Sequence, residues 1–157
     1  RLPFLGRLDV FPALHPSFKG KKAPDWALPA MDGDTVRLAD LRGKVVLIDF
    51  FYKSCAPCCA ALPFLQRLHE KYKDRGLVVV GIDPYDDPEK DKMAEFLSKR
   101  GITYTVLFSD LQLPHNYNVS AYPTIYIVNR RGKIAATHLG YGESMEESLE
   151  KVLKKLL

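Results

Sequence analysis

Residues 48–59 read Ile-Asp-Phe-Phe-Tyr-Lys-Ser-Cys-Ala-Pro-Cys-Cys, and this stretch decides the fold. The apolar run Val45–Ile48 leads into it and predicts a strand, while apolar residues at helical spacing follow it. Cys55 and Cys58 are therefore expected where a strand ends and a helix begins. The first turn of a helix has free backbone N–H groups and the positive end of the helix dipole, which stabilise a thiolate. We expect Cys55 to ionise more readily than a free cysteine, whose pKa is about 8.5.

The three cysteines of the chain all lie within five residues, so they cannot form a framework of structural disulfides. A C-x-x-C pair at a strand–helix junction indicates a redox dithiol. Cys55 is the predicted nucleophile, and Cys58, one helical turn later, is predicted to attack the mixed disulfide and release the partner. Two small buried residues are the structural alternative. Cys59 is expected to point into the core as a small hydrophobe, with a third redox thiol or a metal ligand as alternatives.

Asp49 interrupts the apolar strand that precedes the cysteines. An unpaired carboxylate inside such a strand is costly, and burial should raise its pKa. Asp49 is thus a candidate general acid and base for Cys58, directly or through a water molecule. The alternative is a strand residue that is exposed or paired with a lysine.

The amino-acid composition is typical of a globular protein. The chain has 157 residues, 46% of them hydrophobic and 27% charged, which is enough for one domain with a core. The net charge of +4 is too small and too evenly spread to indicate a nucleic-acid partner. No apolar run has the length of a transmembrane helix. Arg1 follows no initiator Met or signal-peptide pattern, so we expect a processed or trimmed fragment, with any membrane tether outside it.

The chain divides into an extension at residues 1–24 and a domain at residues 25–157. Prolines punctuate the apolar residues of the extension, which excludes a continuous helix or a central strand. We expect it to wrap the domain, or to be the remnant of an upstream segment or an interaction arm.

The domain has a regular order of expected elements. These are a hairpin of strands at 26–30 and 35–38, strands at 45–51, 77–82 and 104–108, helices at 57–73 and 89–100, a turn or two of helix capped by Asp110, a hairpin of 124–128 with 133–137, and a last helix opened by a capping box of Ser144 and Glu147. Pro63 should kink the first helix without ending it. This order predicts an α/β architecture in which helices cover a mixed sheet.

These pieces together resemble the thioredoxin fold. The resemblance rests on Cys55-Ala-Pro-Cys58, the kinked helix after it, Tyr122-Pro123-Thr124 before the antiparallel hairpin, and the final amphipathic helix. The section from Ala23 to Val46 is more specifically similar to the TlpA/ResA-type thiol–disulfide oxidoreductases, which are related to the AhpC/TSA–redoxin group. The resemblance implies a thioredoxin-like fold, with a central mixed β-sheet flanked by helices and an N-terminal β-hairpin extension.

The resemblance also implies an activity and a setting. Members of this family are usually extracytoplasmic in bacteria, facing the periplasm, are often tethered to the membrane, and reduce disulfides in partner proteins. This chain would then be a protein-disulfide reductase that needs no cofactor of its own. Its partners would be a disulfide- or thiol-bearing protein substrate and a redox partner protein.

Several residues acquire expected roles through the resemblance. Asp49, six residues before Cys55, falls at the proton-relay position of thioredoxins. Pro123 falls where the fold has a cis-proline opposite the dithiol, and the Tyr122 backbone would pair with an incoming peptide. Pro57 and Ser54 complete the expected substrate contacts, although the family usually has Trp where Ser54 stands. Tyr52 and Lys53 would also rim the site.

Two other functions compete with this interpretation. A peroxiredoxin-like peroxidase shares the front of the chain, but peroxidatic sites have Thr or Ser three residues before the cysteine, where Tyr52 stands. A metal-binding module would use the thiolates of Cys55, Cys58 and Cys59. Structural zinc usually takes four ligands, commonly from two separated pairs, and the sequence has no second pair.

The remaining polar candidates are weaker. The four histidines are scattered, without metal-ligand spacing. The acidic cluster of Asp83, Asp86 and Asp87 is expected to be a turn with solvated carboxylates, and a cation site is the alternative. Some members of the resembled family carry an acid in this loop, close to the dithiol.

Overall fold

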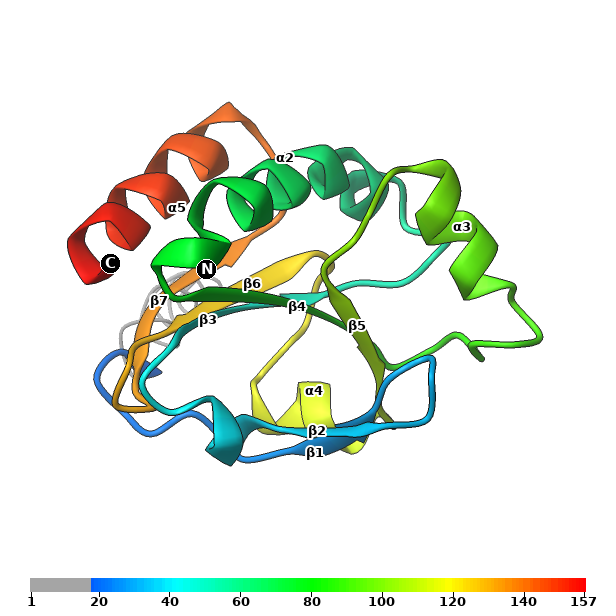
Figure 1. The fold of residues 1–157 in the computed structure, drawn as a ribbon, viewed down its shortest axis with the longest axis horizontal. Coiled ribbons are helices and arrows are strands. Elements are labelled where there is room, and N and C mark those ends of the chain that lie inside the picture. The colour runs from blue at the N-terminus through cyan, green and yellow to red at the C-terminus, as the bar shows by residue number, and fades with distance from the viewer. Residues whose placement is uncertain (1–17) are drawn as a thin grey trace, which may run out of the picture.

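A computed structural model of the protein describes residues 18–157. Figure 1 shows a sheet with helices on one side and a small hairpin on the other. The strands of the described part are β1 (Ala27–Pro29), β2 (Thr35–Arg37), β3 (Val45–Phe50), β4 (Leu77–Asp83), β5 (Thr105–Phe108), β6 (Thr124–Val128) and β7 (Ile134–Leu139). The helices are α2 (Ala56–Tyr72), α3 (Met93–Lys99), α4 (Gln112–Asn116) and α5 (Glu143–Leu156), with 3-10 turns at Leu38–Leu41 and Lys73–Arg75.

The main sheet is mixed, as the sequence predicted. In residues 18–157 it has five strands in the order β5-β4-β3-β6-β7. β3 and β4 are parallel, as are β4 and β5, whereas β6 pairs antiparallel with both β3 and β7. All six residues of β3 are buried, because both faces of this central strand are covered.

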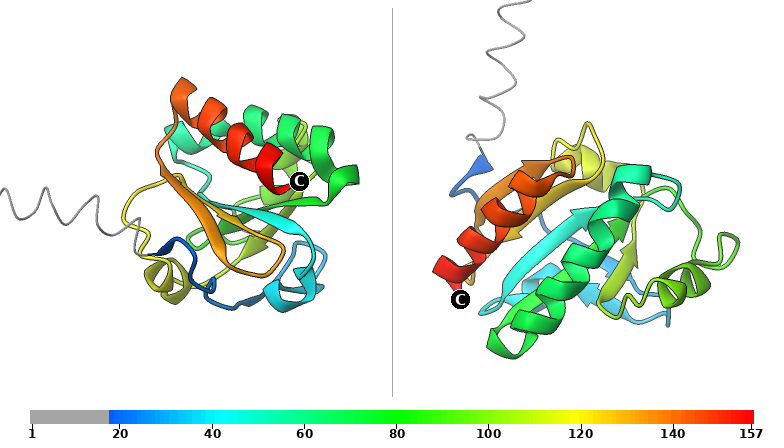
Figure 2. Two further views of the ribbon diagram at one scale, coloured as in Figure 1. Left: turned by 90° about the vertical axis from the view of Figure 1, so that its left-hand side faces the viewer. Right: turned by 90° about the horizontal axis from the view of Figure 1, so that it is seen from above.

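Helices α2, α3 and α5 cover one face of the sheet, which we call the helix face. Alternate residues of the central stretch, Val45, Leu47 and Phe51, pack here with the apolar residues of these helices. Figure 2 shows α2 and α5 running side by side over the strands. The two helices are also joined by an ion pair in which Lys71 Nζ lies 2.6 Å from Glu150 Oε2.

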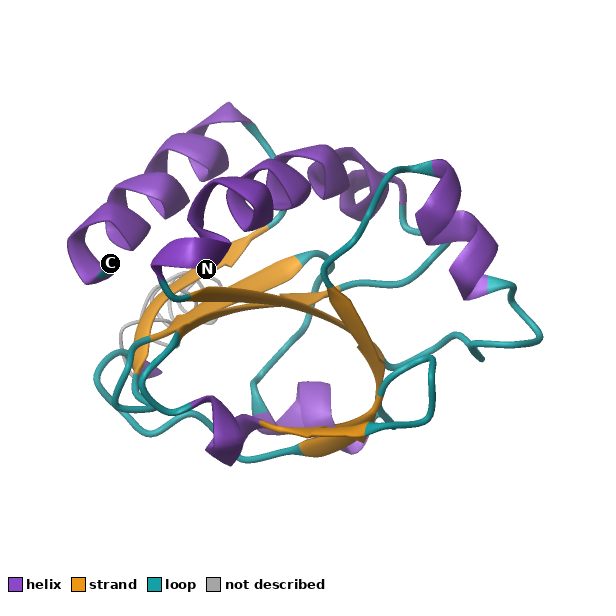
Figure 3. Cartoon of the chain, viewed as in Figure 1, coloured by secondary structure: helices purple, strands orange, loops and turns teal. Residues whose placement is uncertain are grey.

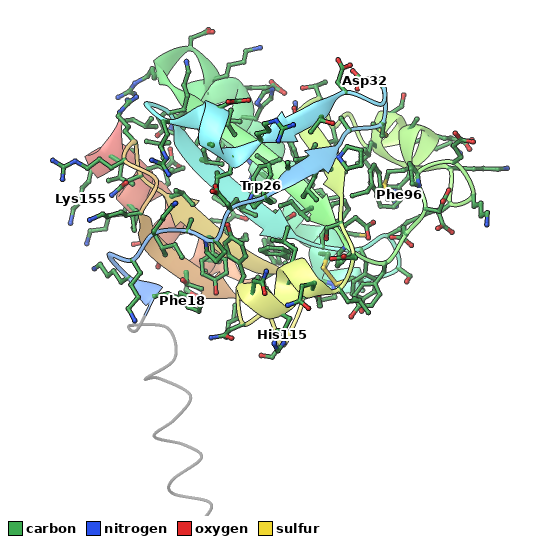
Figure 4. The ribbon with its side chains drawn as sticks, turned by 90° about the horizontal axis from the view of Figure 1, so that it is seen from below. Phe18, Trp26, Asp32, Phe96, His115 and Lys155 are labelled. Carbon is green, nitrogen blue, oxygen red and sulfur yellow. A yellow bond between two sulfur atoms is a disulfide. The ribbon has the colours of Figure 1, made fainter. Side chains whose placement is uncertain are left out.

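The β1–β2 hairpin and α4 cover the opposite face, which we call the hairpin face (Figure 3). Ala30 forms a bridge to Leu107, so the hairpin is anchored at the β5 edge. Trp26 lies among the side chains of this face, and Phe18 lies nearer its margin (Figure 4). The intervening part of strand β3 contributes Val46, Ile48 and Phe50 to this second core.

The N-terminal residues 1–17 of the predicted extension lie outside the described residues, so its proposed wrapping role stays a prediction for them. The end of the extension does pack on the domain. The N–H of Gly20 donates to the Ile134 carbonyl at 2.8 Å, and the N–H of Ile134 donates to the Lys21 carbonyl at 2.8 Å. Ala23 is buried.

Two helix starts differ from the sequence prediction. α3 begins at Met93 and not at residue 89, because the preceding residues form turns that end with Lys92 in the left-handed region at φ 50°. The prediction of a capping box formed by Ser144 and Glu147 is wrong. α5 begins one residue before Ser144, with Gly142 at the N-cap and no side-chain cap, so Ser144 already lies inside the first turn.

Other local predictions are confirmed in part. α2 continues past Pro63 to Tyr72, as predicted, whereas the kink at Pro63 stays a prediction. The N-cap residue of α4 is Leu111 and not the predicted Asp110, although Asp110 Oδ1 accepts a hydrogen bond from the Gln112 N–H at 3.0 Å. α4 also extends beyond the predicted end at Leu113. In residues 18–157 the helices are too short or too polar to cross a membrane.

Candidate active site

Cys55 and Cys58 form a disulfide at the start of α2, with their Cα atoms 5.2 Å apart. Cys55 is the N-cap residue, in an extended conformation, and its sulfur accepts a hydrogen bond from the Cys58 N–H at 3.3 Å. Pro57 occupies the first turn, where a helix tolerates a residue without an N–H. The cysteine pair therefore lies at a strand–helix junction, as the sequence indicated.

The two sulfurs differ in their access to solvent. Cys55 is 5% exposed and Cys58 is 0% exposed, so the part of the pair that reaches the surface belongs to Cys55. The Tyr122 carbonyl oxygen lies 3.7 Å from Cys55 Sγ. The peptide bond between Tyr122 and Pro123 is cis, and Pro123, which has no N–H, is buried beside the disulfide region.

Asp49 lies in the middle of β3, completely buried, between Gly81 of β4 and Ile125 of β6. Strand alternation places its side chain on the helix face with Leu47, in the layer that also contains Cys58. Neither carboxylate oxygen has a hydrogen-bond partner among the described residues. Burial raises the pKa of Asp49 from 3.8 to about 8. The alternatives of an exposed or lysine-paired Asp49 are therefore wrong.

Tyr104 is a second polar group of the helix face, and the sequence pattern did not single it out. Its side chain is buried, and its hydroxyl has no hydrogen-bond partner among the described residues. Burial, and next the negative charge of Asp49, raise the pKa of Tyr104 well above its usual value. The Tyr104 and His69 ring centroids are 6.1 Å apart. Tyr104 starts an apolar strand pattern, so it was indistinguishable from a core aromatic residue.

Lys53 and Cys59 form the side of the site that faces α3. The Lys53 N–H donates to Asp86 Oδ2 at 2.7 Å, whereas Lys53 Nζ donates to the Asp91 carbonyl at 2.6 Å. Cys59 is half-buried and its thiol donates to the Lys53 carbonyl at 3.3 Å. Cys59 therefore packs at the margin of the core and not inside it as predicted, with its thiol hydrogen-bonded to this backbone oxygen.

The expectation of solvated carboxylates in the acidic loop is wrong for Asp83. It is completely buried at the end of β4, and its Oδ1 accepts hydrogen bonds from the N–H groups of Tyr85 and Asp86, each at 2.9 Å. Burial and the neighbouring Asp86 raise the pKa of Asp83 to about 7. Asp87 is exposed, as expected.

Three tyrosines pack against one another beside the disulfide. The ring centroids of Tyr52 and Tyr85 are 5.2 Å apart, those of Tyr52 and Tyr122 are 5.3 Å apart, and those of Tyr85 and Tyr122 are 5.7 Å apart. We call these residues the tyrosine cluster. A pocket of about 480 Å³ opens there, and it is lined by Tyr52, Ser54, Tyr85, Asp86, Ser120 and Tyr122.

Sequence reasoning missed Tyr85 and Ser120 as site residues. Both lie in connecting segments without periodicity, and only the fold brings them beside the residues that precede Cys55. The proline-rich loop 83–88 after a buried strand was the available signal, since functional groups often lie on such loops.

The described residues, 18–157, contain no group of three or more His, Cys, Asp or Glu side chains placed to hold a metal ion. Two of the three thiolates required by the metal-binding alternative are joined in the disulfide. A thiolate metal module is therefore not favoured.

Known proteins of similar sequence support a redox site. The sequence profile of the AhpC/TSA family matches residues 19–137. Thioredoxin-like protein YneN of Bacillus subtilis (strain 168) is 32% identical over 135 residues, which cover 84% of this chain and 79% of YneN. Thiol-disulfide oxidoreductase ResA of Bacillus thuringiensis (strain Al Hakam) is 30% identical over 138 residues, which cover 87% of this chain and 78% of ResA.

A solved structure supports the fold independently. The crystal structure of a Chlorobium tepidum protein, provisionally described as thiol:disulfide interchange protein DsbE, superimposes with a TM-score of 0.80 at 34% sequence identity. The match covers 88% of this chain and 96% of that one. It confirms the predicted thioredoxin-like fold, and the names of the relatives favour disulfide exchange over a peroxidase.

Proposed function

This chain belongs to the AhpC/TSA family and is a thiol–disulfide oxidoreductase, and we propose that it reduces disulfides of partner proteins with Cys55 as the attacking thiolate. The observation that carries the proposal is the Cys55–Cys58 disulfide at the start of α2, in which Cys55 is the cysteine of the pair that retains contact with solvent. Thiol–disulfide exchange requires a thiolate that is both stabilised and accessible.

The reaction proceeds in two exchanges. In the reduced protein the Cys58 N–H and the N-terminus of α2 stabilise the Cys55 thiolate. This thiolate attacks one sulfur of the partner disulfide, and the other partner sulfur leaves as a thiolate. Cys58 then loses its proton and attacks Cys55 Sγ, which forms the intramolecular disulfide and releases the second partner sulfur. Two electrons pass from the dithiol to the partner.

Asp49 handles the proton of Cys58. Its carboxylate accepts the Cys58 proton when Cys58 becomes the nucleophile, and it returns a proton when the disulfide is reduced again. The pKa of about 8 supports this role, because a base whose pKa is near that of a thiol transfers a proton at little cost. A buried water can connect the two groups, since Asp49 has unused hydrogen-bond capacity.

The substrate lies against the Tyr122–Pro123 segment. The Tyr122 carbonyl, 3.7 Å from Cys55 Sγ, is placed to accept a hydrogen bond from an extended partner backbone. Pro123 offers no N–H that would compete for the Cys55 thiolate. Ser54 and Pro57, on either side of Cys55, contact the partner next to its sulfur.

The setting follows from the family resemblance. A thiol–disulfide oxidoreductase acts on thiol- or disulfide-bearing partners and needs a redox partner that restores its dithiol. We place this chain outside the cytoplasm, on the periplasmic side of a bacterial membrane, with any tether outside residues 1–157. Fractionation of cells that express the full-length protein tests this location.

The direction of electron flow is tested by the reduction potential of the Cys55–Cys58 pair. The protein is equilibrated with defined glutathione or dithiothreitol ratios, and free thiols are counted by mass. A single two-electron couple near about −270 mV supports a reductase, whereas a value near about −120 mV identifies an oxidant. A Cys58→Ser variant should accumulate a mixed disulfide with a model substrate through Cys55. Absence of any reversible pair contradicts the proposal.

A further inference from the structure

The pocket of the tyrosine cluster opens beside the reactive sulfur. Ser54 lines it and precedes Cys55 in the chain, and Tyr122 supplies both a lining ring and the carbonyl near Cys55 Sγ. A peptide whose cysteine reacts with Cys55 therefore brings its neighbouring side chains to the mouth of the pocket, because an extended chain advances only about 3.3 Å per residue.

The lining of the pocket combines three tyrosines and two serines with one carboxylate. Tyr85 is 57% exposed although it is a large aromatic residue, and its neighbours Tyr52 and Tyr122 meet it at interplanar angles of 70° each. Asp86 is the charged residue among the lining side chains, and the residues that line the pocket include no cation. The completely buried Asp83 stands directly behind Asp86 and Tyr85 and binds their N–H groups.

Lys53, which lies between the lining residues Tyr52 and Ser54 in the sequence, is directed elsewhere. Lys53 Nζ donates to the Asp91 carbonyl and lies 5.9 Å from the Phe96 ring centroid, so its charge is engaged on the α3 side. The local acidity of the pocket therefore contrasts with the net charge of +4 of the whole chain. An acidic ligand group would be repelled by Asp86. An apolar group would remove water from this carboxylate, and the hydrogen bond from the Lys53 N–H offsets that cost only in part.

We propose that this pocket is a subsite for a lysine or arginine side chain that lies beside the reactive cysteine of the partner protein. The tyrosine faces hold the cation by cation–π attraction, and the Asp86 carboxylate pairs with it. The aliphatic stem of the same side chain covers the exposed ring of Tyr85. This inference rests on the proposed function, and it specifies which disulfides are attacked fastest.

The test uses the reduced protein and three disulfide-containing peptides that differ at the one residue next to the cysteine. This residue is lysine, norleucine as the uncharged match in length, or glutamate. We expect the second-order rate constant for the lysine peptide to exceed that for norleucine roughly tenfold, with glutamate slowest. The preference should decrease as salt is added, because part of the attraction is between charges.

Variants of the lining residues test whether the preference for the lysine peptide arises in the pocket. Tyr85→Leu and Asp86→Asn should each reduce the preference for lysine over norleucine several-fold, and Tyr85→Phe should retain most of it because the ring remains. Asp87→Asn is the matched control, since Asp87 is an exposed neighbour outside the pocket lining. Tyr141→Leu serves as the control for an exposed tyrosine that does not line the pocket.

A small uncharged disulfide, hydroxyethyl disulfide, separates the two proposals. If it is reduced normally while the peptides show no preference for lysine, or if Tyr85→Leu and Asp86→Asn leave the preference intact, the cation subsite is overturned and the reductase stands. A preference for norleucine also overturns it, in favour of an apolar subsite. If neither hydroxyethyl disulfide nor any peptide is reduced, the proposed function itself fails.

Discussion

Two buried tyrosines of the hairpin face and two buried polar groups of the helix face differ in whether they have hydrogen-bond partners. On the hairpin face, the Tyr117 hydroxyl donates to the Pro24 carbonyl at 2.6 Å, and the Tyr126 hydroxyl donates to the Tyr117 carbonyl. On the helix face, Asp49 and the Tyr104 hydroxyl have no hydrogen-bond partner among the described residues. Trp26 Nε1 is an exception on the hairpin face, since it also has none.

Buried polar groups with hydrogen-bond partners stabilise the fold, whereas buried polar groups without partners destabilise it. A buried polar group without a partner costs about 1–3 kcal/mol, and more when it is charged. Asp49 and Tyr104 bear this cost in the layer that contains Cys58. Tyr117 and Tyr126 on the hairpin face avoid it, and so do Tyr72 and Gln66 on the helix side. The contrast supports a chemical role for Asp49, because buried acids with strongly shifted pKa values occur preferentially at functional sites.

The largest expected effect concerns the cysteines. Cys55→Ser should lower the rate of disulfide exchange at least about a thousandfold, because it removes the nucleophile. Cys59→Ser is the matched control one helical turn later, and it should leave the rate nearly unchanged. Both are measured by the reduction of a model disulfide under steady supply of reductant. Equal losses in the two variants would contradict the assignment of Cys55.

The second effect is the pH dependence that Asp49 imposes on stability. Its pKa is 3.8 unfolded and about 8 in the fold, so between these values the folded state binds more protons than the unfolded state. Stability should therefore fall as pH rises from about 4 to about 8. The loss attributable to Asp49 is several kcal/mol, with an upper limit of about 6 kcal/mol.

Asp49→Asn should remove this part of the pH dependence, since the amide does not titrate. Denaturant unfolding of both proteins at pH 5, 7 and 9 measures it. Asp83, whose pKa is also raised, titrates in the same direction, but it is common to both proteins and cancels in their difference. A difference that stays constant across the pH range would show that Asp49 is already ionised at pH 5 in the fold.

A smaller effect is expected on the hairpin face. Tyr117→Phe should destabilise the protein by about 1–2 kcal/mol, because it leaves the Pro24 carbonyl without its donor. The exchange rate of the folded protein should not change. Urea unfolding and the model-disulfide assay measure the two quantities, and a slower exchange reaction would mean that the hairpin face contributes to the chemistry.

The smallest effect is expected for the matched change on the helix face. Tyr104→Phe removes a buried hydroxyl that has no partner among the described residues, so we expect a change within about 1 kcal/mol, neutral or stabilising. The same unfolding experiment compares it directly with Tyr117→Phe. A destabilisation as large as that of Tyr117→Phe would show that the Tyr104 hydroxyl is hydrogen-bonded, for instance through a buried water.

Local sequence predicted the strand, the cysteine pair and the helix that follows it. It also predicted a buried Asp49. Every side chain of a central strand is buried when both faces of the sheet are covered, and Asp49 lies within such a strand of six residues. Predictions failed where several local choices were nearly equal in energy. Ser144 had the right spacing for a capping box, yet the helix starts one residue earlier, since tertiary packing decides such small differences.

The sequence by itself determined the order of elements, the mixed sheet and the position of the dithiol, because these follow from periodicity and from residue types adjacent in the chain. Only the tertiary structure decided which distant residues surround the dithiol. The resemblance placed Tyr122 there, but Tyr85 and Ser120 lie on loops that local patterns leave undefined. The order of the central strands β4, β3 and β6 brings these loops together at one end of the sheet. The proximity of these loops depends on the order and packing of the strands, which no local stretch of sequence encodes.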